Sequence, residues 1–248
     1  MEVHAHTHTD PAHGGTSRKK FTHYLWEFLM LFFAVFAGFL AENLREHIVE
    51  HQRAEQFARS LLGDLEADTA TLKTAIAYGD KKVKAIDSFF LEIELTPGKW
   101  NDTLMYKYGG AAGRVRPFER NSGTYEQMKA SGSLRYFQQE LADLLNKYDV
   151  QGKKVVAREN IGLKYVTDFY NPFQVQVLDS RSVIRIQDGL PPAHPLVFRK
   201  TDKETIALWI NYAAIVQSTQ QRTLIEYNTM MTQANEIIAA LQNEYHLR

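Results

Sequence analysis

The stretch YLWEFLMLFFAVFAGFLA, residues 24–41, decides how this chain is organised. Glu27 is its only charged residue. An α-helix of this length reaches about 27 Å at about 1.5 Å per residue, close to the thickness of the hydrocarbon core of a bilayer. Phenylalanine and leucine occur on every face and leave no polar stripe for water. The stretch predicts a single transmembrane helix at residues 21–45. The alternatives are a buried helix of a soluble domain and a signal peptide.

The residues on either side of this helix predict an uncleaved signal anchor. Arg18, Lys19 and Lys20 precede the apolar run, as the basic region of a signal peptide does. The run then passes into ENLREHIVEHQRAEQ without a small-residue cleavage site. Basic residues concentrate on the cytoplasmic side of membrane helices. The expected topology is therefore a cytoplasmic N-terminus and an exported C-terminal domain.

The composition fits a folded protein and argues against nucleic-acid binding. Of the 248 residues, 44% are hydrophobic, which is sufficient for a core. The formal net charge is zero and acids and bases are interleaved, so no extended positive surface is available for a nucleic-acid backbone. Cysteine is absent, which excludes disulfides, thiolate metal ligands and cysteine nucleophiles.

Residues 1–20, MEVHAHTHTDPAHGGTSRKK, are polar and lack apolar periodicity, which predicts a disordered tail. His4, His6 and His8 alternate within it and are candidate ligands for a divalent cation through neutral imidazoles. Alternation in a disordered tail fixes no ligand geometry. An inert or weakly chelating tail is therefore the favoured interpretation.

Beyond the membrane helix, apolar residues three and four positions apart predict helices that pack against one another. The first pattern continues the membrane helix as a long stalk and stops at Pro97 and Gly98. Its apolar or small positions are Ala58, Leu61, Leu65, Leu72, Ala75, Val83, Ile86, Phe90 and Ile93. A second helical pattern spans residues 133–170, ends at Asn171 and Pro172, and has the length of an antiparallel return.

The last helix is predicted over residues 201–245. Thr201 and Glu204 have the spacing of a capping box at its start, and the spacing of three and four residues continues to its end. Gln217 and Gln220 lie in this seam, where a polar layer fixes register or partner choice at some cost in stability.

The segment between the second and last helices, residues 173–200, includes the proline-rich GLPPAHPL. It is expected to form a long irregular crossover with at most a little strand. The predicted fold class is all-α: one transmembrane helix continues into a stalk, which packs in an antiparallel helical bundle. The predicted domains are the tail at 1–20, the transmembrane helix at 21–45 and the bundle at 46–248.

The stretch HIVEH, residues 47–51, has the H-x-x-E-H spacing of a zinc-hydrolase signature. His47 and His51 share one helical face, and Glu50 lies beside them as a candidate general base. A catalytic zinc also requires a third protein ligand and a pocket that excludes bulk water. Alternating acids and bases surround the motif, as on a solvated helix, and this second interpretation is favoured. Neither metal binding nor any cofactor is predicted.

Within the predicted span, Ala34 with Gly38 and Ala37 with Ala41 form two small-x-x-x-small pairs on adjacent faces. Such pairs allow close approach of a second membrane helix, although lipid also tolerates small residues. These four residues are candidates for membrane-helix packing.

Glu27 is an acid inside the predicted span. Intramembrane acids are costly and mark proton pathways or partner helices. This one lies about one turn inside the cytoplasmic end, where it can reach the headgroups or pair with Lys20 or His23. The interfacial interpretation is favoured over a functional one.

Positive charge concentrates between residues 114 and 137, RVRPFERNSGTYEQMKASGSLRYF. Arg116, Arg120 and Arg135 are candidate residues for binding an anionic ligand or a lipid headgroup. Helix start and stop signals explain much of the same stretch: Gly132 has the character of a helix C-cap and Ser133 that of the next start.

The order of WEFLMLFFAVFAGFLAENLREH, LLGDLEADTATL and SGTYEQMKASGSLRYFQQELADLLNKY resembles a family of uncharacterised bacterial envelope proteins. The resemblance covers about residues 20–150. Its most specific positions are Glu27, Gly38, Asn43, Asp64, Leu65, Asp68, Ser131 and Gly132. Where that family carries a tryptophan followed by Asn-Glu near the membrane exit, this chain has LAENL. The resemblance implies one N-terminal membrane helix, a mostly helical extramembrane domain and a bacterial inner-membrane location. It implies no catalytic residue.

These observations together favour a non-enzymatic structural or interaction subunit of an envelope assembly. Its expected partners are the lipid bilayer and either a second copy of the chain or another membrane or envelope protein. The first alternative is a membrane-anchored ligand-sensing module that uses the arginine-rich stretch. The remote alternative is a membrane-surface zinc hydrolase that uses HIVEH.

Overall fold

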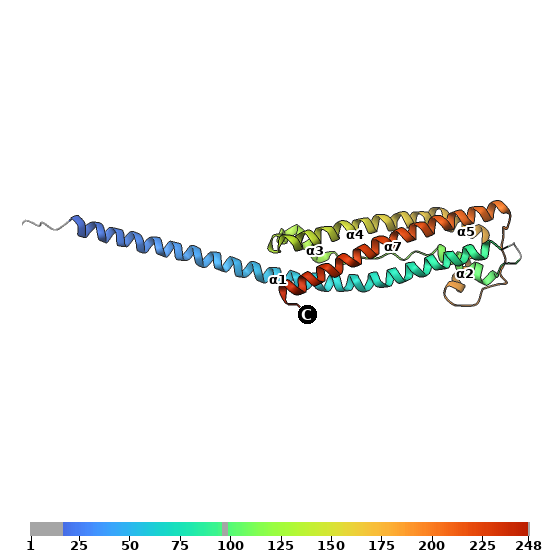
Figure 1. Ribbon diagram of the computed structural model, residues 1–248, viewed down its shortest axis with the longest axis horizontal. Helices are drawn as coiled ribbons and strands as arrows, with labels where there is room; N and C mark the ends of the chain where they lie inside the picture. Colours follow the sequence, from blue (N-terminus) through green and yellow to red (C-terminus); the bar gives the residue numbers. More distant parts are fainter. Residues whose placement is uncertain (1–16, 96–98, 248) are drawn as a thin grey trace, which may run out of the picture. The chain divides into compact units, whose positions relative to one another are not determined.

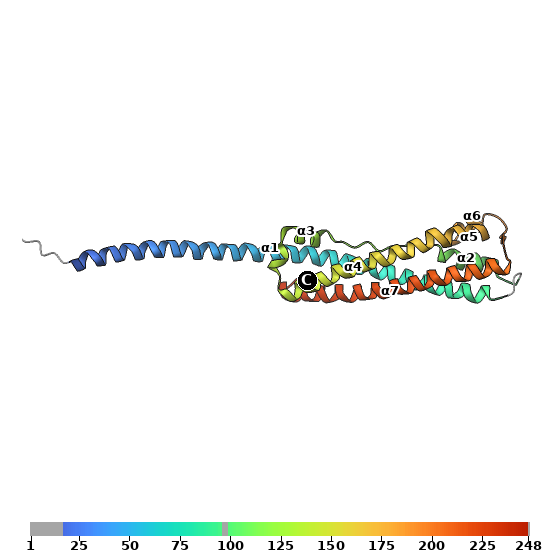
Figure 2. The same cartoon turned by 90° about the horizontal axis from the view of Figure 1, so that it is seen from above.

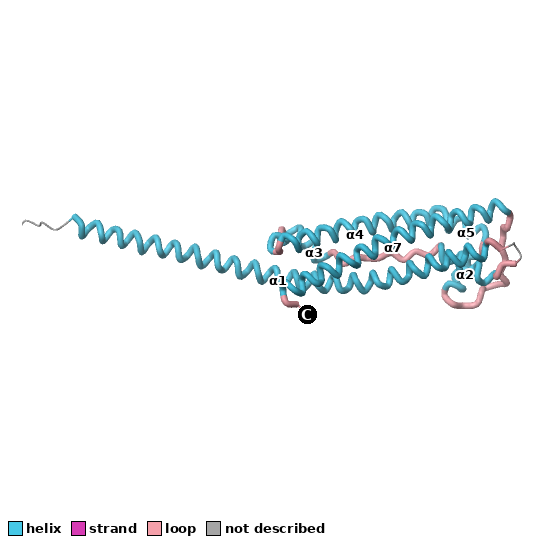
Figure 3. The backbone as a smooth tube through the Cα atoms, in the orientation of Figure 1, coloured by secondary structure: helices cyan, strands magenta, loops and turns pink. Residues whose placement is uncertain are grey.

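The computed structural model describes residues 17–95 and 99–247, with side chains described from residue 21. The elements in chain order are α1 (Ser17–Ile93), α2 (Asp102–Ala112), α3 (Gly123–Ser131), the 3₁₀ helix η1 (Ser133–Tyr136), α4 (Gln139–Tyr165), the π-helix η2 (Val166–Tyr170), α5 (Asn171–Val177), α6 (Ser180–Gln187) and α7 (Lys203–Tyr245). The described residues contain no β-strand (Figure 3), so the predicted all-α class is confirmed. The chain forms two compact units, residues 1–53 and 54–248.

The first unit contains the apolar stretch. Among the described residues, one helix is long and apolar enough to cross a membrane, and none of its apolar window is buried against protein. Large side chains stand exposed around the helix, with Leu31, Val35 and Phe39 each about two-thirds accessible. A soluble unit would bury such a surface against other elements. The histidine tail that contains His4, His6 and His8 lies outside the described residues.

In the second unit, three long helical segments lie side by side: residues 54–93 of α1, α4 and α7 (Figures 1 and 2). Asp68 of α1 is bonded to Tyr148 early in α4, whereas Asp87, late in α1, is bonded to Gln217 early in α7. α7 therefore runs antiparallel to α1. α4 runs parallel to α1, so the prediction that residues 133–170 form an antiparallel return is wrong.

An extended segment, residues 114–122, runs back along the bundle in the direction opposite to α1. The sequence predicts that the helix at residues 133–170 makes this return. The extended segment leaves α2 at one end of the bundle and runs beside the long helices to α3 at the other end (Figure 3). Its Arg114 contacts Lys82 of α1 and its Asn121 contacts Asp68, so residue numbers rise along the segment as they fall along α1. This segment occupies the position of a fourth bundle element.

The seam of α1 follows the predicted heptad spacing. Its buried positions are Ala54, Ala58, Leu61, Leu65, Asp68, Leu72, Ala75, Gly79, Lys82, Ile86, Phe89 and Ile93, separated by alternating steps of four and three residues. Val83 and Phe90, which were placed in this seam, are partly buried beside it. Asp68 and Lys82 occupy core positions that a heptad normally gives to apolar residues.

The interior of this unit is divided into two hydrophobic clusters. The first joins α1 up to Ala75 with the first half of α4 and the second half of α7. The second begins at Ile86 of α1 and includes α2, η2, α6 and the first half of α7. Lys82 lies between these two stretches of α1, and Glu159 lies between Val155 of the first cluster and Val166 of the second. The core is thus interrupted by a polar layer at its middle.

The helical path around Pro172 differs from the prediction. The backbone does not stop there but continues through η2 into α5, with the proline in the first turn of α5. A π-helical turn directly before the proline lets the continuous helix accommodate its ring and its missing N–H. The segment expected to be an irregular crossover, 173–200, therefore contains α5 and α6 and is irregular only from Asp188 onward.

The last helix is confirmed, with a different cap. Asp202, rather than Thr201, is the N-cap, and its carboxylate accepts a hydrogen bond from the Thr205 N–H at 2.9 Å. Gln217 and Gln220, expected as a polar layer in the seam, are both partly buried, and Gln217 lies beside the buried Val216. Gln217 donates from Nε2 to Asp87 Oδ1 at 2.6 Å, which ties α7 to α1 in one register.

We predict opposite effects of alanine at two helical glycines. A Cβ at Gly109 of α2 would lie 2.8 Å from Trp209 Cζ2. That ring is buried, and its Nε1 donates to the Tyr170 hydroxyl at 3.1 Å, so it cannot yield. Gly109→Ala should lower the free energy of unfolding by about 1–3 kcal/mol.

Gly63 of α1 is the matched control, because a Cβ there meets no atom within 4 Å. Gly63→Ala should raise the free energy of unfolding by about 0.5–1 kcal/mol through helix propensity. Chemical denaturation of the detergent-solubilised protein measures both. Stabilisation by Gly109→Ala would contradict this packing of α2 on α7.

Candidate functional site

The extended segment, residues 114–122, determines which polar groups lie inside the bundle. An extended backbone among helices has no neighbouring strand, so its N–H and C=O groups need side-chain partners wherever they are buried. Pro117 removes one donor from this requirement. The phenyl ring of Phe118 is buried and meets the ring of Tyr227 edge to face at 6.1 Å between centroids. Phe118 therefore anchors the segment in the core, while the four residues that precede it, 114–117, are exposed.

Three ionisable side chains of the long helices form hydrogen bonds with the backbone of this segment. Lys82 Nζ donates to the carbonyl oxygen of Arg114 at 2.5 Å. The N–H of Phe118 donates to Glu159 Oε1 at 2.7 Å, and the N–H of Asn121 donates to Asp68 Oδ1 at 2.8 Å. α1 supplies two of these partners and α4 the third. The charged residues in the helix seams are thus explained by the backbone that they bind.

Asp68 is the centre of the first of these contacts. It is completely buried, and its other carboxylate oxygen accepts from the Tyr148 hydroxyl at 2.7 Å. Burial raises the pKa of Asp68, while hydrogen bonds from Asn121 and Tyr148 and the charge of Arg120 act in the opposite direction. Burial beside this carboxylate also raises the pKa of Tyr148, so the phenol stays protonated as the donor.

An ion pair next to this contact fixes the same end of the extended segment. Arg120 Nη2 lies 2.8 Å from Asp149 Oδ1, and Lys153 Nζ lies 2.7 Å from the second oxygen. The aliphatic part of Arg120 rests on Gly152, where a Cβ would lie 3.2 Å from its Cδ. Burial acts to raise the pKa of Asp149, but the two cations outweigh it and lower that pKa.

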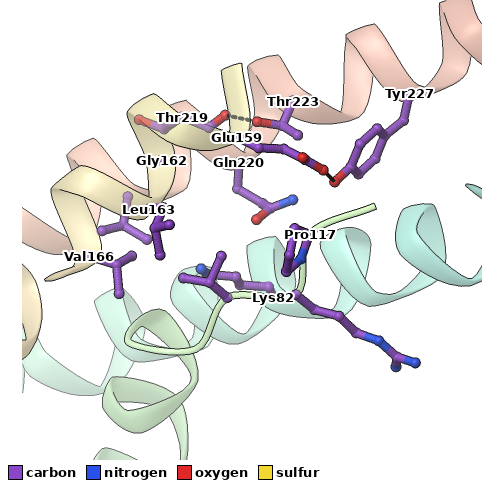
Figure 4. A pocket seen from close by; sticks show the side chains of 13 residues that line it. Lys82, Pro117, Glu159, Gly162, Leu163, Val166, Thr219, Gln220, Thr223 and Tyr227 are labelled. Atoms are coloured by element: carbon purple, nitrogen blue, oxygen red, sulfur yellow. Dashed lines mark hydrogen bonds between the residues drawn. The ribbon is translucent and has the colours of Figure 1, made fainter. Parts of the chain in front are cut away.

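A small cavity lies in the polar layer between the two hydrophobic clusters (Figure 4). Lys82 lies on one side of it, and Glu159 lies on the other side, hydrogen-bonded to the Tyr227 hydroxyl. Thr219 and Thr223 complete the wall from α7. The volume is about 30 Å³. This is room for water but not for an organic substrate.

Lys82 and Glu159, two of the charged residues that line this cavity, have pKa values shifted from the ordinary ones. Burial lowers the pKa of Lys82 to about 8, and no carboxylate among the described residues forms an ion pair with it. Burial also raises the pKa of Glu159, opposed by the hydrogen bonds from the Phe118 N–H and the Tyr227 hydroxyl. Both side chains are committed to the extended segment, so the arrangement is suited to hold the segment and not to transfer protons to a substrate.

The predicted anion-binding arginines lie in different surroundings. Arg116 lines the small cavity. Arg120 is committed to Asp149 and lines a second cavity beside Tyr148. Arg135 lies on η1, with its guanidinium 5.1 Å from the centre of the Tyr136 ring. The cavity lined by Arg116 and the one lined by Arg120 are separate, so no shared pocket for the three residues emerges.

The HIVEH motif lies on an exposed part of α1. His47 and His51 both face solvent, and the described part of the chain places no third histidine or carboxylate with them in a group able to hold a metal ion. Glu27 pairs with His23, whose Nε2 lies 3.1 Å from Glu27 Oε1. This is one of the two partners expected from the sequence.

The sequence reasoning missed the residues that the geometry brings forward. Asp68 and Lys82 continue the heptad seam of α1, and a charge at a seam position is a readable signal of a buried polar contact. Glu159 occupies the equivalent seam position of α4, between Val155 and Val166. A search of the seams for charged residues would have found all three.

Comparison of the chain with protein-family models, with curated proteins and with solved structures gave no match. The resemblance to bacterial envelope proteins therefore stays a prediction.

We predict that Lys82→Met changes the pH dependence of stability. Between pH 8 and 10.5 the unfolded chain binds more protons at Lys82 than the folded chain, so the stability contributed by this site rises with pH. The unfolding free energy of Lys82→Met minus that of the wild type should fall by about 3 kcal/mol between about pH 7 and about pH 10.5.

Lys84→Met is the matched control, because Lys84 is an exposed neighbour on α1. Its difference from the wild type should stay constant over the same pH range. Denaturant titrations at several pH values measure both variants. Equal pH dependence in the two variants would show that Lys82 is not buried in its charged form.

Proposed function

We propose that this protein is a non-enzymatic, membrane-anchored interaction subunit of a bacterial envelope assembly. The observation that carries the proposal is the apolar stretch at residues 24–41, whose side chains no described part of the chain covers. Lipid or another membrane helix must cover such a surface in the cell. The resemblance to envelope proteins with one N-terminal membrane helix supports the same assignment.

The basic cluster Arg18, Lys19 and Lys20 supports a cytoplasmic N-terminus. In that orientation, the bundle at residues 54–248 lies in the periplasm and the helix acts as an uncleaved signal anchor.

Self-association through the membrane helix is the second part of the proposal. Gly38 and Ala34 share one face, and a Cβ added at Gly38 would meet no atom within 4 Å. The glycine therefore has no packing role within the chain itself. Small residues at this spacing allow close approach of a second helix, with Ala37 and Ala41 extending the same surface.

The bundle also offers a surface for a partner. A groove of about 490 Å³ between α4 and α7 is lined by Arg158, Ile161, Tyr165 and Ile215. The three apolar side chains are each more than one-third exposed. Aromatic residues and arginine are enriched in protein interfaces. Arg222 adds a second cation, and no acidic residue lines the groove. An amphipathic helix with acidic side chains is the partner that complements it.

The non-enzymatic part of the proposal rests on the polar groups of the bundle. Asp68, Lys82 and Glu159, the buried ionisable groups that bind the extended segment, are occupied by its backbone. The cavity beside Lys82 and Glu159 is too small for a substrate. His47 and His51 stand on an open helix surface that does not exclude water.

Disulfide crosslinking in membranes tests this proposal without background, because the chain contains no cysteine. Gly38→Cys should give a disulfide-linked dimer on mild oxidation of native membranes. Phe36→Cys is the control, since two residues at about 100° per residue place it on nearly the opposite face. It should give much less dimer. Monomer at both positions, with no link to another polypeptide, would contradict the assembly role.

A further inference from the structure

A second groove on the bundle unit collects positive charge from three elements. α1 contributes Lys81 and Lys82, α2 contributes Lys107, and the extended segment contributes Arg114. The groove has a volume of about 290 Å³, near the lower end of the range for small-molecule sites. These cations are far apart in the sequence and meet only through the fold.

No acidic side chain in the lining neutralises the positive charge of the groove. No aspartate or glutamate lines it. Arg114 has a partner at its edge, with Nη2 2.8 Å from Asp188 Oδ1. The three lysines that line it form no ion pair with any carboxylate in the described residues, so no neighbouring acid compensates their charge. A divalent anion matches this charge better than a monovalent one.

Lys82 distinguishes this groove from a chance group of surface lysines. Its side chain is only 5% exposed, and its ammonium group donates to one carbonyl oxygen, that of Arg114. A buried ammonium group without a counter-ion is costly, because low-dielectric surroundings disfavour charge. An anion in the groove would supply the missing partner. Folding has thus placed a cation without a counter-ion in the wall of an open groove.

The walls of the groove define the rest of the ligand. Tyr78 of α1 and Tyr108 of α2 face the space, with Ala85 and Ala111 between the charged positions. The ammonium group of Lys107 lies 5.9 Å from the centre of the Tyr108 ring. Tyrosine rings and alanine methyl groups favour an aromatic or aliphatic body over a bare inorganic ion.

We propose that this groove binds a small organic phosphate, with the phosphate group among Lys81, Lys82 and Lys107 and the apolar body against Tyr78 and Tyr108. The phosphate provides two negative charges and several acceptor oxygens for the lysine ammonium groups. The site is distinct from the arginines selected from the sequence. It also does not depend on the assembly role, because every residue that it uses lies within the bundle unit.

Lysine footprinting of the full-length protein in neutral detergent tests the site, with phenyl phosphate as the probe. An acylating reagent modifies exposed amines, and mass spectrometry measures the modification of each lysine. Phenyl phosphate should protect Lys81 and Lys107 severalfold. Lys84, which is exposed on α1 and does not line the groove, is the internal control and should react at an unchanged rate. If phenyl phosphate leaves the rate of each of the three lysines unchanged, a soluble phosphate is excluded as the ligand.

Calorimetric titration with the same probe measures the contribution of each cation. Lys82→Met should weaken binding about tenfold or more, because it removes a charge-assisted contact. Lys107→Gln keeps the assay informative if Lys82→Met does not fold, since Lys107 is exposed, and it should weaken binding in the same direction. Lys84→Gln should bind as the wild type does. Unchanged affinity in a folded Lys82→Met or in Lys107→Gln would overturn the assignment.

The phosphate can come from a soluble metabolite or from a lipid headgroup, and a second arm separates these sources. The protein is reconstituted in phosphatidylcholine vesicles with and without phosphatidylglycerol, and the same footprint is recorded. Protection of Lys107 by phosphatidylglycerol but not by phenyl phosphate would assign the site to a lipid phosphate. Protection by phenyl phosphate would assign it to a soluble ligand. Protection by neither would overturn the proposal.

Discussion

The structure of the bundle depends on the backbone of one extended segment, residues 114–122. Helices satisfy their own backbone hydrogen bonds, but an extended segment packed against them cannot. Each buried N–H or C=O left without a partner costs about 1–3 kcal/mol. Asp68, Lys82 and Glu159 supply the partners, and they do so from seam positions of α1 and α4. The path of the chain depends on these contacts. Because the extended segment returns to the end of the bundle where the packed part of α1 begins, α4 starts there and runs parallel to α1.

The charged residues that bind the extended segment also divide the core into two clusters and have shifted pKa values. A bundle with only apolar seams would have one continuous core, whereas this one has two clusters with a polar layer between them. Burial lowers the pKa of Lys82 and raises that of Glu159, which is the cost of placing both groups in that layer. Lys82 then serves two surfaces. It binds the Arg114 carbonyl on the inside and faces the basic groove on the outside.

The coarse fold could be predicted from the sequence because it rests on periodicity. The apolar stretch, the α1 seam and the last helix follow from spacing alone, and Gln217 does bind across to α1. The same spacing carries no information on whether two helices run parallel or antiparallel, so the direction of α4 was missed. Pro172 predicts a helix stop, because local rules do not include the π-helical turn that precedes it in the structure.

The candidate site was less predictable than the fold. The basic groove joins Lys82, Lys107 and Arg114, which only the packing of α2 and the extended segment against α1 brings together. Charge density along the sequence pointed instead to Arg116, Arg120 and Arg135, and these separate in space. Asp68 lies in the heptad seam of α1, and only the fold shows that the backbone of Asn121 is its partner.

Native-state hydrogen exchange of the Phe118 and Asn121 amides tests the account most directly. If Glu159 and Asp68 bind these amides inside the bundle, both should exchange about as slowly as the amide of Leu145, a buried residue in the first half of α4. Exchange as fast as that of Val197, an exposed residue of the irregular segment before α7, would show that these two amides are not bound by the helices. The explanation of the buried charges would then fail.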